Sequence, residues 1–191
     1  MNCKIKKAFK ELGAVVKEPK TDSIVDFFDA IELNIPLYSK AWEDNLFGID
    51  EFRLKYKESV YENVMEHFFT PDISPNGHTW FSPKLFKPFT ADYDKWQFRE
   101  SDEDINVTAI REVIKDGVLE FLIIFESYSY PDHFFICLND PHPENPTVFS
   151  TDHEEFFLEI ENEGNLESFL DDFLRKDEFY RIFKNCYNEG V

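Results

Sequence analysis

The potential metal ligands and nucleophiles of this sequence are its five histidines and three cysteines. His133, Cys137 and His142 come closest to a ligand set, because imidazole nitrogen and thiolate sulfur are ligands that zinc prefers. In an extended strand, however, His133, Phe135 and Cys137 share one face. A thiol among aromatic side chains is more commonly a buried core residue than a ligand. We therefore predict no metal site and no cofactor.

Catalysis by a nucleophile or by paired carboxylates has equally little support. A catalytic Cys137 would need a histidine base and surroundings that lower the thiol pKa, whereas the negative charge of this chain acts in the opposite direction. Glu154 and Glu155 form a carboxylate pair, but such pairs are expected by chance among 39 Asp and Glu residues. GxSxG, GxGxxG and Walker-type phosphate-binding motifs are absent. We predict no catalytic residues, and an enzyme is the third hypothesis for function.

The charge distribution is the most unusual property of the sequence. The formal net charge is −19, and residues 116–174 contain fifteen Asp and Glu but no Lys or Arg. A field of this sign repels nucleic acid and anionic lipid, so we predict no direct nucleic-acid binding. One interpretation is a solvated surface that keeps the protein in solution. The other is a binding face for a basic protein, which would associate with it rapidly and in a salt-sensitive way.

Cysteine usage and hydropathy bear on the location of the protein. No apolar run approaches the roughly 20 residues of a membrane helix. The N-terminus contains lysines but lacks the uninterrupted apolar core of a secretory signal. The three cysteines are widely spaced and form no CxxC pair, which suits reduced thiols better than a disulfide framework. We expect a cytoplasmic protein that makes no contact with a membrane.

The strands expected in this chain fall mainly in its second half. Residues 118–125 are apolar except for Glu120, which predicts a buried strand. The preceding Asp116-Gly117 pair predicts a type I′ turn, with a partner strand over residues 107–115. Further strands are expected over residues 133–138, 147–149 and 156–160, with an edge strand at residues 96–98. Together these segments predict an antiparallel meander.

Helices are expected on both sides of the strands, because apolar residues recur there at i, i+3, i+4 and i+7. The expected helices lie within residues 1–16, after the capping residues 21–23, from Pro36 to before Gly48, over residues 57–69, after the capping residue Asn165, and around Phe179 and Phe183. Residues 57–105, rich in proline and aromatic residues, are interpreted as an elaboration of the domain. The predicted fold is one α+β domain over residues 1–191, with an antiparallel or mixed sheet of about five or six strands flanked by N-terminal and C-terminal helices.

Several of these segments resemble the C-terminal half of the SUKH superfamily. They are an apolar strand, an aromatic strand ending in Leu138-Asn139-Asp140, a Pro-rich loop, a short Pro-Thr-Val-Phe strand, Asp152-His153-Glu154 and a Ser168-Phe169-Leu170 helix. The superfamily includes fungal cell-wall synthesis regulators and bacterial immunity proteins that neutralise toxins. The resemblance implies a SUKH-like fold and a non-enzymatic, protein-binding role.

With this resemblance, the acidic loops become the candidate partner-binding surface. The first hypothesis is an immunity protein that binds a basic cognate toxin domain, such as a nuclease, and occludes it. Lys and Arg of the toxin would pair with the loop acids Asp140, Glu144, Asp152, Glu154 and Glu155, with His142 and Tyr130 as aromatic contacts. The alternative is a regulatory scaffold that resembles the fungal cell-wall synthesis regulators and binds signalling or envelope-synthesis proteins.

Overall fold

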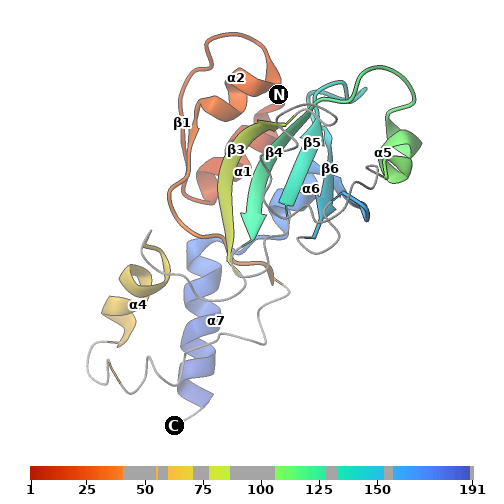
Figure 1. Ribbon diagram of the computed structural model, residues 1–191. Helices are drawn as coiled ribbons and strands as arrows, with labels where there is room; N and C mark the ends of the chain where they lie inside the picture. Colours follow the sequence, from red (N-terminus) through yellow and green to blue (C-terminus); the bar gives the residue numbers. More distant parts are fainter. Residues whose placement is uncertain are drawn as a thin grey trace.

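The computed structural model describes residues 1–40, 55, 60–70, 78–86, 106–127, 133–152 and 157–189 (Figure 1). Within them, one five-stranded antiparallel sheet has the strand order β3-β4-β5-β6-β7, and β1 and β2 form a two-stranded sheet. The strands are β1 (Val15–Val16), β2 (Ile31–Glu32), β3 (Thr79–Phe86), β4 (Phe121–Ser127), β5 (His133–Cys137), β6 (Thr147–Thr151) and β7 (Glu161–Asn165). The helices are α1 (Cys3–Glu11), α2 (Ile24–Asp29), α4 (Val60–Phe68), α5 (Thr108–Val113), α6 (Leu166–Asp171) and α7 (Lys176–Glu189). The predicted α+β class, with an antiparallel sheet and helices towards both ends of the chain, is confirmed.

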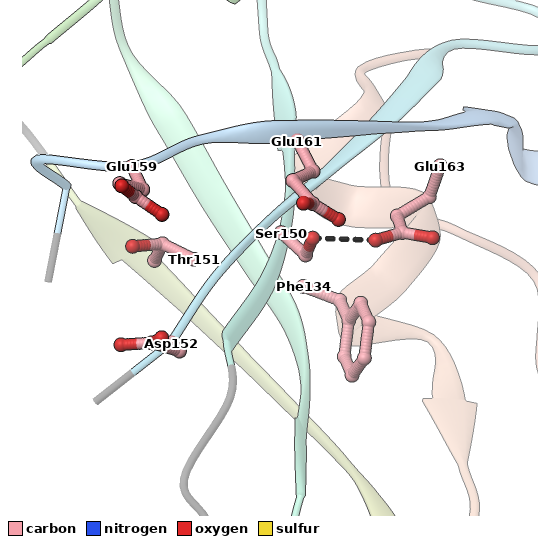
Figure 2. Close-up of a pocket in the computed structure, with 7 residues that line it drawn as sticks. All are labelled: Phe134, Ser150, Thr151, Asp152, Glu159, Glu161 and Glu163. Atoms are coloured by element: carbon pink, nitrogen blue, oxygen red, sulfur yellow. Dashed lines mark hydrogen bonds between the residues drawn. The ribbon is translucent and has the colours of Figure 1, made fainter. Parts of the chain in front are cut away.

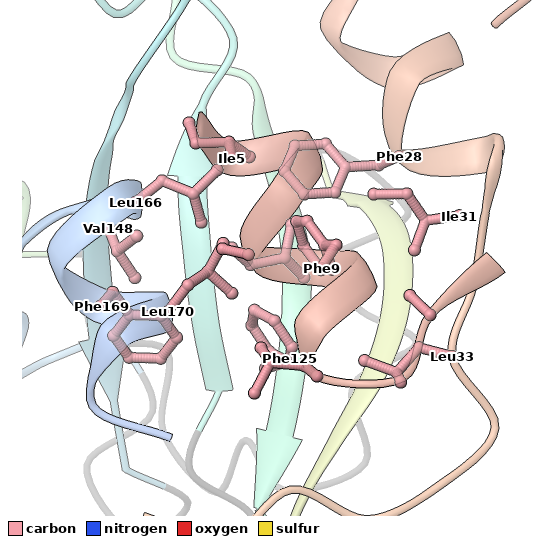
Figure 3. Close-up of a cluster of buried hydrophobic side chains, with 14 of the residues drawn as sticks. Ile5, Phe9, Phe28, Ile31, Leu33, Phe125, Val148, Leu166, Phe169 and Leu170 are labelled. Atoms are coloured by element: carbon pink, nitrogen blue, oxygen red, sulfur yellow. The ribbon is translucent and has the colours of Figure 1, made fainter. Parts of the chain in front are cut away.

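The first hydrophobic core lies between one face of the large sheet and helices α1 and α6 (Figure 3). Phe9 of α1 is fully buried, and its ring centroid lies 5.5 Å from that of Phe81 and 6.3 Å from that of Phe125. Asn2 begins the helix by accepting a hydrogen bond from the Ile5 N–H, which satisfies a donor at the helix end. The expected amphipathic N-terminal helix is therefore confirmed, and its apolar stripe covers the sheet.

A second core covers the opposite face of the sheet. Phe121 and Phe135 pack against Phe157, with ring centroids 5.6 and 5.0 Å apart, and Ile110 of α5 joins the same cluster. Residues 121–125 of β4 are buried throughout, because Phe121 and Ile123 enter the second core while Leu122, Ile124 and Phe125 enter the first. An apolar run that lacks polar alternation is the expected pattern for such a strand.

A third core, which we call the Tyr38 cluster, joins α4 and α7; its buried members are Tyr38, Val64, Phe68, Phe69, Leu174, Phe179 and Phe183. The Tyr38 ring centroid lies 4.5 Å from that of Phe179, and the Tyr38 hydroxyl donates to the Phe68 carbonyl at 2.6 Å. Leu37 forms a β-bridge with Thr79 at the start of β3. Figure 1 shows α7 extending away from the large sheet with α4 beside it.

The predicted strand over residues 107–115 is wrong, because most of this segment forms helix α5. Ile110 and Ile114 are both buried, a spacing that places both side chains on one face of a helix. Arg111 donates to the Ile114 and Gly117 carbonyls and so holds the turn that follows the helix. The neighbours of β4 are β3 and β5 instead.

Strand β3 lies inside the segment interpreted as an elaboration. It contains Pro83, and proline is rare inside a central strand, since it cannot donate to a ladder. In the structure, Pro83 falls within the register shift between Phe81 and Lys84, and β3 is an edge strand among the described residues. A bulge on an edge strand is a position that tolerates proline.

Two other predicted elements are corrected. Residues 36–39 are not helical, because Leu37 and Ser39 form β-bridges; Lys40 is in a 3₁₀ turn, and the rest of that predicted helix lies outside the described residues. Residues 157–160 form turns, with a positive φ of 57° at Phe157, and the strand follows as β7. The predicted edge strand at residues 96–98 lies outside the described residues. The helix capped by Asn165 and the last helix are observed as α6 and α7.

Candidate functional site: an acidic pocket beside strand β7

A cavity of about 260 Å³ lies beside strands β5, β6 and β7 (Figure 2). Among the described residues, its lining consists of Phe134, Ser150, Thr151, Asp152, Glu159, Glu161 and Glu163. Four of these side chains are carboxylates, and none is a lysine or arginine. We call this cavity the acidic pocket.

The pairing of β6 with β7 places the glutamates over the cavity. Ser150 lies opposite Glu161 in the register, and Ser150 also lies opposite Phe134 on β5. Figure 2 shows Glu159, Glu161 and Glu163 on the same side of the chain as Ser150. The Ser150 hydroxyl donates to the Glu163 carboxylate, which orients that side chain across the cavity.

Phe134 gives the pocket an apolar wall. Its ring is partly buried and packs against Phe169 of α6, with centroids 5.0 Å apart. Phe134 also packs against the first core, so the pocket borders that core directly. An aromatic ring beside carboxylates can contact the apolar stem of a long cationic side chain while the carboxylates bind its charged end.

The three glutamates of the pocket, Glu159, Glu161 and Glu163, form no ion pair with a described lysine or arginine. The ion pairs observed within the described part of the chain involve other acids, for example Lys4 with Glu167 at 2.8 Å and Lys84 with Glu126 at 2.7 Å. Like charges held close together repel one another, so the pocket favours the approach of a positive group.

Asp140 has a structural role that the sequence hypothesis did not foresee. Its side chain is 5% exposed, and its two carboxylate oxygens accept from the N–H groups of His142 and Thr147 at 2.7 and 2.9 Å. A buried carboxylate that accepts two backbone hydrogen bonds stabilises the loop before β6 and is not available to bind a partner. The candidate surface therefore omits Asp140.

The loop over residues 139–146 is fixed from several sides. The Asn2 N–H donates to the Glu144 carbonyl, and the Glu167 N–H donates to the Asn145 side chain. His142 and Glu144 remain exposed at the tip of the loop, with the His142 Nδ1 atom 3.8 Å from a Glu144 oxygen. This loop presents two of the predicted contact residues on a fixed backbone.

The predicted contact residues form two groups instead of one surface. His142 and Glu144 precede β6, whereas Asp152 follows it and lines the acidic pocket. Five residues of strand, at a rise of about 3.3 Å each, place these groups roughly 15 Å apart. Tyr130, Glu154 and Glu155 lie outside the described residues.

Glu159, Glu161 and Glu163 were counted among the acids of the chain but not chosen as site residues. Their signal in the sequence is the alternation Glu159-Ile160-Glu161-Asn162-Glu163, in which a carboxylate recurs at every second position. This period is that of one face of a strand. Because the segment is almost devoid of apolar residues, hydrophobic patterning gave no reason to expect a strand there.

The hypotheses of a metal site and of a cysteine nucleophile gain no support. His133 and Cys137 stand at opposite ends of β5, roughly 13 Å apart along the strand, so they cannot share an ion. Cys137 is buried, its thiol donates to the Asn139 side chain at 3.0 Å, and burial raises its pKa to about 11. Such a thiol is protonated at neutral pH and unreactive. No group of three or more His, Cys, Asp or Glu side chains in the described ranges is arranged to hold a metal ion.

Comparison of the chain with protein-family models, with curated proteins and with solved structures found no match. Over the described ranges, every helix is too short or too polar to cross a membrane.

Proposed function

We propose that this chain is a non-enzymatic binding domain of the immunity-protein type, which neutralises a basic toxin domain by binding it through the acidic pocket. The observation that carries the proposal is the cavity lined by Asp152, Glu159, Glu161 and Glu163 without a described lysine or arginine. The resemblance of the sequence to the SUKH superfamily is its second support. A regulatory scaffold would use the same surface for a different partner.

The electrostatics of the chain suit a partner whose active site is cationic. A nuclease domain carries lysines and arginines where it binds phosphate groups, and a net charge of −19 steers such a surface towards the chain. A lysine or arginine of the partner would enter the pocket, with its stem on Phe134 and its charge among the glutamates. The partner's phosphate-binding residues would then be occupied by protein carboxylates, which excludes its substrate.

The experiment is affinity capture of the tagged full-length chain from lysate of its own source cells, at low and at high salt. The pocket variant E159K/E161K/E163K reverses three charges at the pocket. The control variant E18K/D22K/D29K makes the same charge change at exposed positions around β1 and α2. We expect one basic protein to be captured by the wild-type and control chains at low salt, to be lost at high salt, and to be missed by the pocket variant.

The captured protein is then assayed for toxicity and for nuclease activity, with and without one equivalent of this chain. Inhibition by the wild-type and control chains, but not by the pocket variant, is the expected result. Capture of several signalling or envelope-synthesis proteins would favour the scaffold instead. Equal capture by the pocket and control variants would contradict the assignment of the site.

A further inference from the structure

A histidine is buried where the Tyr38 cluster meets the large sheet. His78 is 4% exposed, and its Nδ1 atom has no hydrogen-bond partner. Its ring lies nearly perpendicular to that of Tyr38, with centroids 3.9 Å apart and an interplanar angle of 80°. A neutral imidazole is tolerated in such a site, whereas an imidazolium would lose its hydration.

Among the described residues, no carboxylate is observed beside His78 that would compensate for a positive charge. The Tyr38 hydroxyl donates to the Phe68 carbonyl, and burial raises the pKa of that hydroxyl far above its usual range. The described neighbours of the Tyr38 cluster include two bases, His67 on α4 and Lys176 at the start of α7, and the phenol of Tyr180 on α7. Burial accordingly lowers the pKa of His78 to about 4.

The position of His78 in the fold gives its protonation a local consequence. His78 immediately precedes Thr79, whose backbone forms both hydrogen bonds of the bridge to Leu37, at 2.8 and 3.1 Å. Tyr38, which follows Leu37, is a buried member of the Tyr38 cluster. Its carbonyl accepts a hydrogen bond from the Leu174 N–H at 2.8 Å. Within the described residues, α4 and α7 contact each other, and Tyr38 lies in the core that they share. Leu37, Tyr38 and His78 therefore form the joint between these helices and the sheet.

We propose that His78 and Tyr38 form an acid-sensitive joint, at which protonation of His78 releases α4 and α7 from the sheet while the two sheet cores stay folded. This inference is independent of the proposed function. Between the ordinary pKa of histidine, 6.5, and about 4, the released state binds a proton that the docked state excludes. Docking is therefore strongest above pH 6.5, weakens as the pH falls, and loses the full contribution of His78 below about pH 4.

The test is a pH titration of the isotope-labelled full chain by NMR, which follows the His78 Cε1 proton together with amide hydrogen exchange. On acidification, we expect the amides of α4 and α7 to lose protection while those of β4 and β5 keep it. The variant H78F keeps an aromatic ring but cannot be protonated, and should shift this loss about one pH unit lower. The control H142F removes an exposed histidine and should leave it unchanged.

Three results would overturn the proposal. They are a His78 resonance that titrates near pH 6.5 in the docked state, an opening of α4 and α7 that H78F does not shift, and simultaneous loss of protection in β4. If H78F does not fold, the titration of the wild-type chain tests the proposal by itself. The proposal requires the His78 resonance to titrate over the same pH range in which the α7 amides lose protection.

Discussion

One face of the large sheet is a hydrophobic core at one end and an acidic pocket at the other. Val148 on β6 is fully buried in the first core, whereas Ser150, two residues further along the same strand, faces the glutamates of β7. Helix α6 packs beside Val148 (Figure 3), whereas Ser150 lines the acidic pocket (Figure 2). Two side chains on the same face of one strand thus have different surroundings: Val148 packs in a core that stabilises the fold, and Ser150 lies in a pocket lined by four carboxylates and by no described lysine or arginine.

This contrast predicts that stability depends more on the core end than on the pocket end. The largest effect is expected for Phe9→Ala, which removes a fully buried ring from the first core. Truncation of a buried phenylalanine lowers the free energy of unfolding by about 3 to 5 kcal/mol, measured by urea denaturation. Phe134→Ala, at the wall of the pocket, should lower it by less than about 2 kcal/mol. Equal losses for the two variants would contradict the division.

The loop before β6 should behave as part of the fold, although it is acidic. Asp140→Ala leaves the N–H groups of His142 and Thr147 without their acceptor, and should lower the free energy of unfolding by about 2 to 4 kcal/mol. Asp140→Asn keeps one oxygen acceptor and should lower the free energy of unfolding by less. Glu144 is in the same loop but exposed, and Glu144→Ala should change the free energy of unfolding by less than about 0.5 kcal/mol. A stable Asp140→Ala variant would return this residue to the candidate surface.

A smaller loss is expected at the turn before β4. Gly117 has a φ of +96°, and a Cβ atom there would lie 2.8 Å from the Asn139 side-chain nitrogen. Gly117→Ala should therefore lower the free energy of unfolding by about 1 to 2 kcal/mol. Val118→Ala, at a neighbouring position that is 79% exposed, is the matched control and should have almost no effect. Thermal unfolding followed by circular dichroism would compare the two, and similar midpoints would show that the turn is not constrained.

The smallest effect on stability, and one of opposite sign, is expected inside the pocket. Glu161→Gln with Glu163→Gln removes two repelling charges, while the amide oxygen of residue 163 can still accept from Ser150. We expect a gain of up to about 0.5 kcal/mol at low ionic strength that disappears near 1 M salt, where charges are screened within about 3 Å. The control is the double variant Glu18→Gln with Asp22→Asn, which removes two charges at exposed positions outside the pocket. A clear loss of stability would mean that the pocket carboxylates support the fold.

The sequence predicted the parts of the fold that depend on hydrophobic period and capping. The stripe of α1, the apolar run of β4 and the Asn165 cap of α6 all carry a local signal that tertiary packing does not override. The Asp116-Gly117 pair was misleading, because the turn it forms follows helix α5 instead of a hairpin strand. Strand β3 was missed, because its Pro83 is tolerated only at a bulge on an edge strand, which depends on strand order.

The site was predicted less well than the fold, for a physical reason. Net charge identifies acidic segments, but only the register of β6 with β7 shows which carboxylates converge on one cavity. Asp152 was chosen and does line the pocket, whereas Asp140 proved to be a buried acceptor of backbone hydrogen bonds. Composition alone does not distinguish these two aspartates.

The central claim is that the acidic pocket, and not net charge alone, binds a basic partner. It is tested most directly by the association rate of the captured partner, measured by stopped flow at several salt concentrations. For the pocket variant E159K/E161K/E163K we expect a rate at least about tenfold lower than wild type and a weaker salt dependence. The control E18K/D22K/D29K, with the same net charge, should stay within about threefold of wild type. Equal slowing of both variants would show that only net charge matters, and would contradict the assignment of the pocket.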